Sequence, residues 1–69
     1  MYYLVKELPG HDPVKIDEDK NLQALKDRIF KKFSDKYSVD EVQEKNIFYD
    51  SEAGYFVMDE FYFKELNIS

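Results

Sequence analysis

One amphipathic segment lies between two pairs of short extended segments, and this order restricts the folds open to the chain. Within residues 22–37, apolar side chains recur at the three- and four-residue spacing of one helical face. They are Leu22, Leu25, Ile29 and Phe33, with Phe30 and Tyr37 beside them. Asp19 or Asn21 can cap the segment, and the acidic run at residues 17–19 suits the positive end of a helix. The sequence therefore predicts a helix that buries one face.

Extended segments lie before and after the predicted helix. They are residues 2–8 and 14–17 on one side, and residues 47–49 and 55–58 on the other. The turn-forming run at residues 9–13 joins the first pair into a hairpin. Residues 50–54 form the loop of a second hairpin, in which Gly54 can take a positive φ. Ser38 and Glu41 have the spacing of a capping box, which predicts a short helical turn before that hairpin.

These elements predict an α+β domain, a two-layer ββαββ sheet with one helix packed on one face. The simplest chain path places the first and fourth strands side by side in the centre of the sheet, running parallel. Residues 61–68 favour a fifth, C-terminal strand, because three consecutive rings prefer extended structure. The 69 residues form a single domain, 1–69. The chain has no cysteine, so its six Tyr and six Phe are the main source of a core.

The start of the chain resembles the first hairpin of ubiquitin-like β-grasp domains. Those domains carry Met, Val-Lys, Leu and Gly at the spacing found here in Met1-Tyr2-Tyr3-Leu4-Val5-Lys6-Glu7-Leu8-Pro9-Gly10. The helical segment from Leu22 to Ile29 lies at the matching distance. Residues 29–59 separately resemble the helix-plus-hairpin half of streptococcal immunoglobulin-binding domains, which are also β-grasp folds.

Each resemblance covers about half of the chain and implies a fold without implying a function. The chain ends in Asn67-Ile68-Ser69, so it lacks the terminal di-glycine that conjugation in the manner of ubiquitin requires. Nothing in the sequence identifies an immunoglobulin-binding surface either. We therefore expect the β-grasp plan and take no activity from it.

The sequence shows no equipped active site. His11 is the sole histidine and lies in a turn, where we expect it to be solvated. Asp17, Asp19 and Asn21 match the first positions of a calcium-binding loop, but Leu22 stands where that loop needs glycine. Helix capping explains these residues better. We therefore expect a protein that is not an enzyme and that holds no metal and no cofactor.

The predicted strands are apolar on both faces, although one helix can cover only one of them. If Met1, Tyr3 and Val5 point toward the helix, then Tyr2 and Leu4 point away from it. The same conflict recurs in the third and fourth strands. Large exposed apolar patches are uncommon on monomers, so we expect the aromatic tail, a second copy of the chain, or a partner to cover the second face.

Acidic residues are concentrated in the second half of the chain. The net charge is −5, with eight Lys and Arg against seven Asp and Glu up to Tyr37, and two Lys against eight Asp and Glu beyond it. Such a surface favours basic partners and repels nucleic acid. Tyrosine beside carboxylates suits recognition, since rings supply contact area and carboxylates select cations. The candidate partner-binding residues are Tyr49, Asp50, Glu52, Tyr55, Asp59, Glu60 and Tyr62.

We therefore expect a small acidic protein-binding or regulatory module whose partner has a basic surface. One alternative is a phage-type inhibitor that mimics nucleic acid by presenting spaced carboxylates. The least favoured alternative is nucleic-acid binding through the basic helix, by Lys26, Arg28, Lys31, Lys32 and Lys36. No apolar run approaches the roughly 20 residues that span a bilayer, and the start lacks a basic leader, so we expect a cytoplasmic protein.

Overall fold

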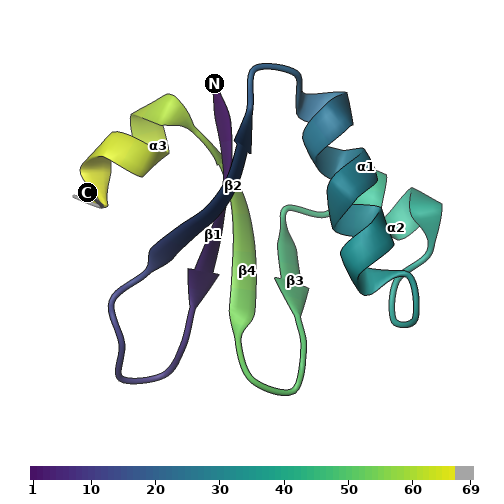
Figure 1. Cartoon of the computed structure of the whole chain (residues 1–69), viewed down its shortest axis with the longest axis horizontal. Coiled ribbons are helices and arrows are strands. Elements are labelled where there is room, and N and C mark those ends of the chain that lie inside the picture. Colours follow the sequence, from purple (N-terminus) through teal and green to yellow (C-terminus); the bar gives the residue numbers. More distant parts are fainter. Residues whose placement is uncertain (67–69) are drawn as a thin grey trace.

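A computed structural model describes residues 1–66 as a four-stranded antiparallel sheet with three helices (Figure 1). The elements in chain order are β1 (Tyr2–Glu7), β2 (Val14–Asp19), α1 (Leu22–Phe33), α2 (Val39–Glu44), β3 (Ile47–Tyr49), β4 (Gly54–Asp59) and α3 (Glu60–Glu65). The strand order is β2-β1-β4-β3, so both predicted hairpins and the central position of β1 and β4 are confirmed. The chain has the predicted α+β class.

The two central strands are antiparallel, so the predicted parallel pair was wrong. Tyr2 lies opposite Asp59 and Glu7 lies opposite Gly54. The reason is α2, which follows α1 and returns the chain toward the end of the sheet where α1 began (Figure 1). Strand β3 then runs in the same direction as β1, and β4 runs against it. The strand order and the helix-on-sheet layers are compatible with a β-grasp-like fold, whereas the direction of the second hairpin differs from the predicted one.

The predicted fifth strand was also wrong, because residues 60–65 form the helix α3. Asp59 caps this helix, since its Oδ1 accepts a hydrogen bond of 3.1 Å from the backbone N–H of Tyr62. The cap fixes a helical turn that strand propensity alone did not predict. The last part of that prediction, residues 67 and 68, lies outside the described residues.

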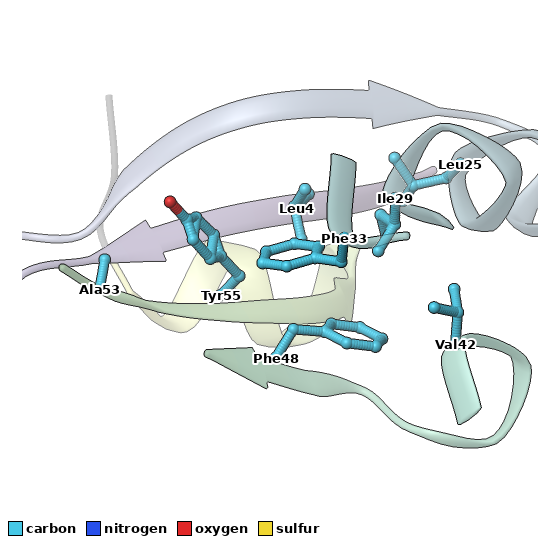
Figure 2. Packing of buried hydrophobic residues seen from close by; sticks show 8 residues of the cluster. All are labelled: Leu4, Leu25, Ile29, Phe33, Val42, Phe48, Ala53 and Tyr55. Atoms are coloured by element: carbon cyan, nitrogen blue, oxygen red, sulfur yellow. The ribbon is translucent and has the colours of Figure 1, made fainter. Parts of the chain in front are cut away.

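The core lies between α1, α2 and the face of the sheet that they cover (Figure 2). Phe33 is at its centre, with its ring 5.0 Å from that of Tyr55 and 5.6 Å from that of Phe48. Its other buried members are Leu4, Leu25, Ile29, Val42 and Ala53. Rings of this size remove much apolar surface from water, which is how a short chain without disulfides obtains a core.

The predicted helix caps are confirmed. Asn21 is the N-cap of α1, and its Oδ1 accepts a hydrogen bond from the N–H of Ala24. Ser38 and Glu41 form both hydrogen bonds of a capping box at the start of α2. These local signals were readable in the sequence because capping depends on residues three positions apart.

The second face of the sheet is partly covered by α3. With Tyr3 assumed to point toward the helix, Leu4 was expected to point away from it. The structure has the reverse orientation, because Leu4 belongs to the core under α1 whereas Tyr3 lies on the other face. There the ring of Tyr3 stacks on that of Phe63, with centroids 3.9 Å apart and planes at 10°. The aromatic tail was one of three expected ways to cover the second face. It does cover β1, but it does so as a helix and not as a strand.

Candidate binding surface

The half of the second face formed by β3 and β4 carries exposed apolar side chains. Ile47 lies directly opposite Phe56, and Tyr49 directly opposite Gly54, so their side chains share one face. Phe48 and Tyr55, the pair between them, point to the core. The exposed fractions are 45% for Ile47 and 57% for Tyr49. We name this surface the open face and define it by Ile47, Tyr49, Phe56 and Met58, with Tyr62 of α3 at its border.

The ring of Tyr49 lies across Gly54. A methyl group at Gly54 would lie 3.3 Å from Cε1 of Tyr49 and 3.5 Å from Cε2 of Phe56. The absence of a side chain at this position therefore lets the two rings lie close to the sheet. One exposed ring, Tyr49, and one half-buried ring, Phe56, are thus positioned beside Gly54.

Two hollows adjoin the open face, and Phe56 lines both of them. The larger one, about 560 Å³, lies between β4, the first residue of α1 and α3, and is lined mainly by apolar side chains such as Leu22, Ile47 and Tyr62. The smaller one, about 410 Å³, lies between the turns of the two hairpins. Two hollows of a size that can admit side chains therefore adjoin the open face.

The hollows carry negative charge. Asp59 lines the larger hollow, and Glu7, Asp50 and Glu52 line the smaller one. Among the described residues that line either hollow, none is Lys or Arg. The surface around the open face therefore favours cationic groups, as expected from the excess of acid in the second half of the chain.

The structure separates the predicted partner-binding residues into two groups at opposite ends of β4. Tyr49, Asp50 and Glu52 lie at the turn between β3 and β4. The second group, Asp59, Glu60 and Tyr62, lies where β4 passes into α3. Tyr49 and Tyr62 are well exposed, and they border the open face from its two ends.

Tyr55 is not on this surface, since its side chain is 2% exposed and belongs to the core. Its hydroxyl donates a 2.6 Å hydrogen bond to Oδ2 of Asp50, and Oδ1 of Asp50 accepts bonds from the N–H groups of Glu52 and Ala53. The bond from Tyr55, together with those from the backbone, lowers the pKa of Asp50 to about 2. Burial, and then the bond to Asp50, raises the pKa of Tyr55 to about 12. This pair shapes the turn.

Two other predicted carboxylates have structural contacts. Asp59 caps α3, and Glu60 lies 3.5 Å from the N-terminal ammonium group and 3.7 Å from Nζ of Lys64. Both pairs of Glu60 are partly exposed, so they add little stability and leave its charge near the surface. Asp59 and Glu60 can therefore still contribute to the field around the larger hollow.

Ile47, Phe56 and Met58 were not among the predicted site residues. The signal for them was present, because β3 and β4 are apolar on both faces. Alternation alone did not reveal which face the helices would cover. Selecting tyrosines and carboxylates favoured residues that belong to the turn and the core instead.

Some of the basic side chains of α1 make hydrogen bonds or ion pairs within the protein. Lys26 is buried, and its Nζ donates to the carbonyl oxygens of Val42, at 2.7 Å, and Lys45. Arg28 donates to carboxylates of both Asp17 and Asp19. Two of the five cations considered for nucleic-acid binding therefore already have protein partners.

No family model, curated protein or solved structure matches this chain. Between residues 1 and 66, no helix combines the length and apolar character needed to cross a membrane. In the same range, no group of three or more His, Asp or Glu side chains could hold a metal ion. Interpretation of the open face therefore rests on its own geometry and charge.

Proposed function

We propose that this protein is a binding module that docks a basic segment of another protein on the open face. The observation that carries the proposal is the combination of exposed Ile47 and Tyr49 with two neighbouring hollows whose described charged residues include four carboxylates and no Lys or Arg. Aromatic and aliphatic side chains on a sheet provide contact area with little loss of side-chain freedom. The carboxylates would attract and orient the cations of the partner.

Binding would have two separable components. Apolar contact with Tyr49, Phe56 and Ile47 would set the lifetime of the complex, because it requires desolvation of a small, well-packed centre. The surrounding carboxylates would raise the association rate, and salt would screen their effect over about 8–10 Å. Added salt should therefore slow association more than it accelerates dissociation.

Affinity capture with matched variants tests this function. The full chain is immobilised, proteins bound from cytosol are identified, and each is purified for a binding measurement against wild type, the double variant I47A/Y49A and the control V39A. Val39 is an exposed aliphatic residue on α2, in the helical layer. Loss of binding in the double variant, with retention in V39A, supports the proposal. Equal binding by all three proteins contradicts it.

The same experiment separates the other interpretations. Sedimentation of the purified chain over a range of concentrations shows whether a second copy occupies the open face. A captured partner that DNA displaces would instead indicate a protein that imitates nucleic acid. Direct retention of labelled nucleic acid at low salt would assign binding to the remaining lysines of α1, Lys31, Lys32 and Lys36.

A further inference from the structure

A third hollow, of about 270 Å³, lies on the helical side of the sheet between α1 and the first hairpin. Its apolar lining consists of Leu4, Ile16 and Ile29. Two lysines line it as well, Lys6 from β1 and Lys32 from α1. This site is separate from the open face, because the sheet stands between them.

The two lysines converge on one buried ring. Lys6 lies directly opposite Tyr55 in the pairing of β1 and β4, and its Nζ is 5.8 Å from the centre of the Tyr55 ring. Nζ of Lys32 is 5.4 Å from the same ring centre. Ammonium groups at this distance are attracted to an aromatic face, so the Tyr55 ring restrains both side chains.

One carboxylate, that of Asp17, also lines the hollow, and it is paired with Arg28 and not with either lysine. Within residues 1–66, no carboxylate lies within 4.0 Å of Nζ of Lys6 or Lys32. Arg28 also lines the hollow, but its guanidinium is already bound to Asp17 and Asp19. Two lysines without a carboxylate partner among the described residues therefore line one hollow of a chain whose net charge is −5.

We propose that this hollow binds a small phosphate monoester, with Lys6 and Lys32 holding the phosphoryl group. A phosphate monoester carries between one and a half and two negative charges at pH 7, roughly matching the two ammonium groups. Lysine donates charge-assisted hydrogen bonds to phosphoryl oxygens, and such bonds are stronger than those between neutral groups. The organic part lies against Leu4, Ile16 and Ile29, and the volume limits it to about one ring or a short chain.

Titration of ¹⁵N-labelled full-length protein with phenyl phosphate, followed by two-dimensional NMR, tests the proposal. We expect saturable shifts at the backbone amides of Lys6, Ile16, Ile29 and Lys32. Phenol lacks the phosphoryl group and inorganic phosphate lacks the ring, so each should bind more weakly. The variants K6Q and K32Q should each lose about tenfold in affinity, which corresponds to one charge-assisted hydrogen bond.

The matched control is K31Q, since Lys31 is an exposed lysine of the same helix that does not line the hollow. It should retain the wild-type affinity. Shifts that do not saturate, or equal losses in K31Q and K32Q, would overturn the proposal and indicate a diffuse counterion effect. The spectra of the unliganded variants establish that each is folded. I47A/Y49A should bind phenyl phosphate normally, so failure of this proposal and failure of the proposed function are distinguishable.

Discussion

Tyr55 donates a hydrogen bond of 2.6 Å to Asp50, and this bond ties the turn between β3 and β4 to the core. The Tyr55 ring packs against Phe33 below the turn, at a centroid distance of 5.0 Å. Asp50 in turn accepts two backbone hydrogen bonds within the loop, from Glu52 and Ala53. One carboxylate therefore fixes the loop and satisfies a phenol that would otherwise be buried without a partner.

The variant Y55F should reduce the free energy of unfolding by about 1 kcal/mol, since it removes one hydrogen bond and keeps the ring.

Y55F should also change how the free energy of unfolding depends on pH in alkaline solution. The pKa of Tyr55 is raised to about 12, so the folded state holds this proton more tightly than the unfolded chain. That stabilisation is complete below pH about 10 and is lost as the pH rises toward 12. Urea unfolding between pH 8 and 11.5 should show a shallower loss in Y55F than in wild type.

Acid should weaken the Tyr55–Asp50 hydrogen bond by protonating Asp50. The pKa of Asp50 is lowered to about 2 from an ordinary 3.8, so its stabilising contribution is present above pH about 4 and is lost as the pH falls to 2. Arg28 also contributes to lowering the pKa values of Asp17 and Asp19, which adds to the loss of stability in acid. D50N should therefore flatten part of the acid limb in urea unfolding. An unchanged acid limb would show that Asp50 is not held as described.

The sequence predicted the elements with local signals and missed those that depend on the chain path. The stripe from Leu25 to Phe33 predicted α1, and the capping box predicted α2. The direction of β4 could not be predicted, because it depends on how far α2 carries the chain before β3 begins. The rings at residues 61–63 favoured a strand, yet the cap at Asp59 and the stacking of Phe63 on Tyr3 favour a helix. The direction of β4 and the stacking on Tyr3 depend on contacts distant in sequence, whereas the cap at Asp59 is a local signal that the strand propensity of the rings outweighed in the prediction.

Lys26 links α1 to the end of α2 through four acceptors. Besides Val42 and Lys45, its Nζ contacts the carbonyl oxygen of Gln43 and Oδ1 of Asn46. Carbonyl groups in the last turn of a helix lack backbone donors, and a cation also suits the negative end of the helix dipole. No pattern in the sequence distinguished this buried lysine from the exposed ones beside it.

K26M should cost about 2–3 kcal/mol in the free energy of unfolding, because it leaves buried carbonyl groups without a donor. K31M, on the exposed side of α1, should cost less than about 0.5 kcal/mol.

Burial lowers the pKa of Lys26 below its ordinary 10.5, so the unfolded chain holds this proton more tightly. Its contribution to stability therefore rises with pH toward 10.5, and K26M should lack that rise. Chemical unfolding at pH 7 and pH 9.5 measures both effects. Equal costs for K26M and K31M would argue against the buried contact.

The sequence placed its candidate residues on the second hairpin and the tail, and several of them have structural roles. Tyrosine and aspartate are residue types that suit recognition surfaces. The same chemistry makes Tyr55 and Asp50 suitable for fixing a turn. Burial separates the two uses, and burial depends on which face of the sheet the helices cover. Tyr49 and Tyr62, selected for the same chemistry, are exposed in the fold.

F63A should destabilise the protein by about 2 kcal/mol, because it removes the stacked ring that covers Tyr3. It should also increase binding of a hydrophobic dye by exposing apolar surface of the sheet. F61A provides the matched control, since Phe61 lies on the same helix and is 76% exposed. That variant should change stability by less than about 0.5 kcal/mol and leave dye binding unchanged. Equal effects of the two substitutions would mean that α3 does not cover the sheet through Phe63.

Substitution of the two glycines should lower stability for different reasons, a close ring at Gly54 and a positive φ at Gly10. In G54A the new methyl group would press on the Tyr49 ring, which lies 3.3 Å from it. That ring is exposed and can move, so stability should fall by less than about 1 kcal/mol. In G10A there is space around the methyl group, but Gly10 has a φ of +77°, which L residues adopt with strain. G10A should therefore lose about 1 kcal/mol in the free energy of unfolding, and it is not a control for binding because Gly10 lines the smaller hollow.

Binding of the partner should also respond to G54A. Displacing the Tyr49 ring alters one end of the open face, so G54A should weaken the complex severalfold, while V39A, in the helical layer, should bind as wild type does. The near-ultraviolet circular dichroism of tyrosine gives a readout that needs no partner, and it should change in G54A alone. If G54A leaves both the spectrum and the affinity unchanged, the Tyr49 ring does not rest on Gly54. If the spectrum changes and the affinity does not, the ring is placed correctly but the partner binds elsewhere.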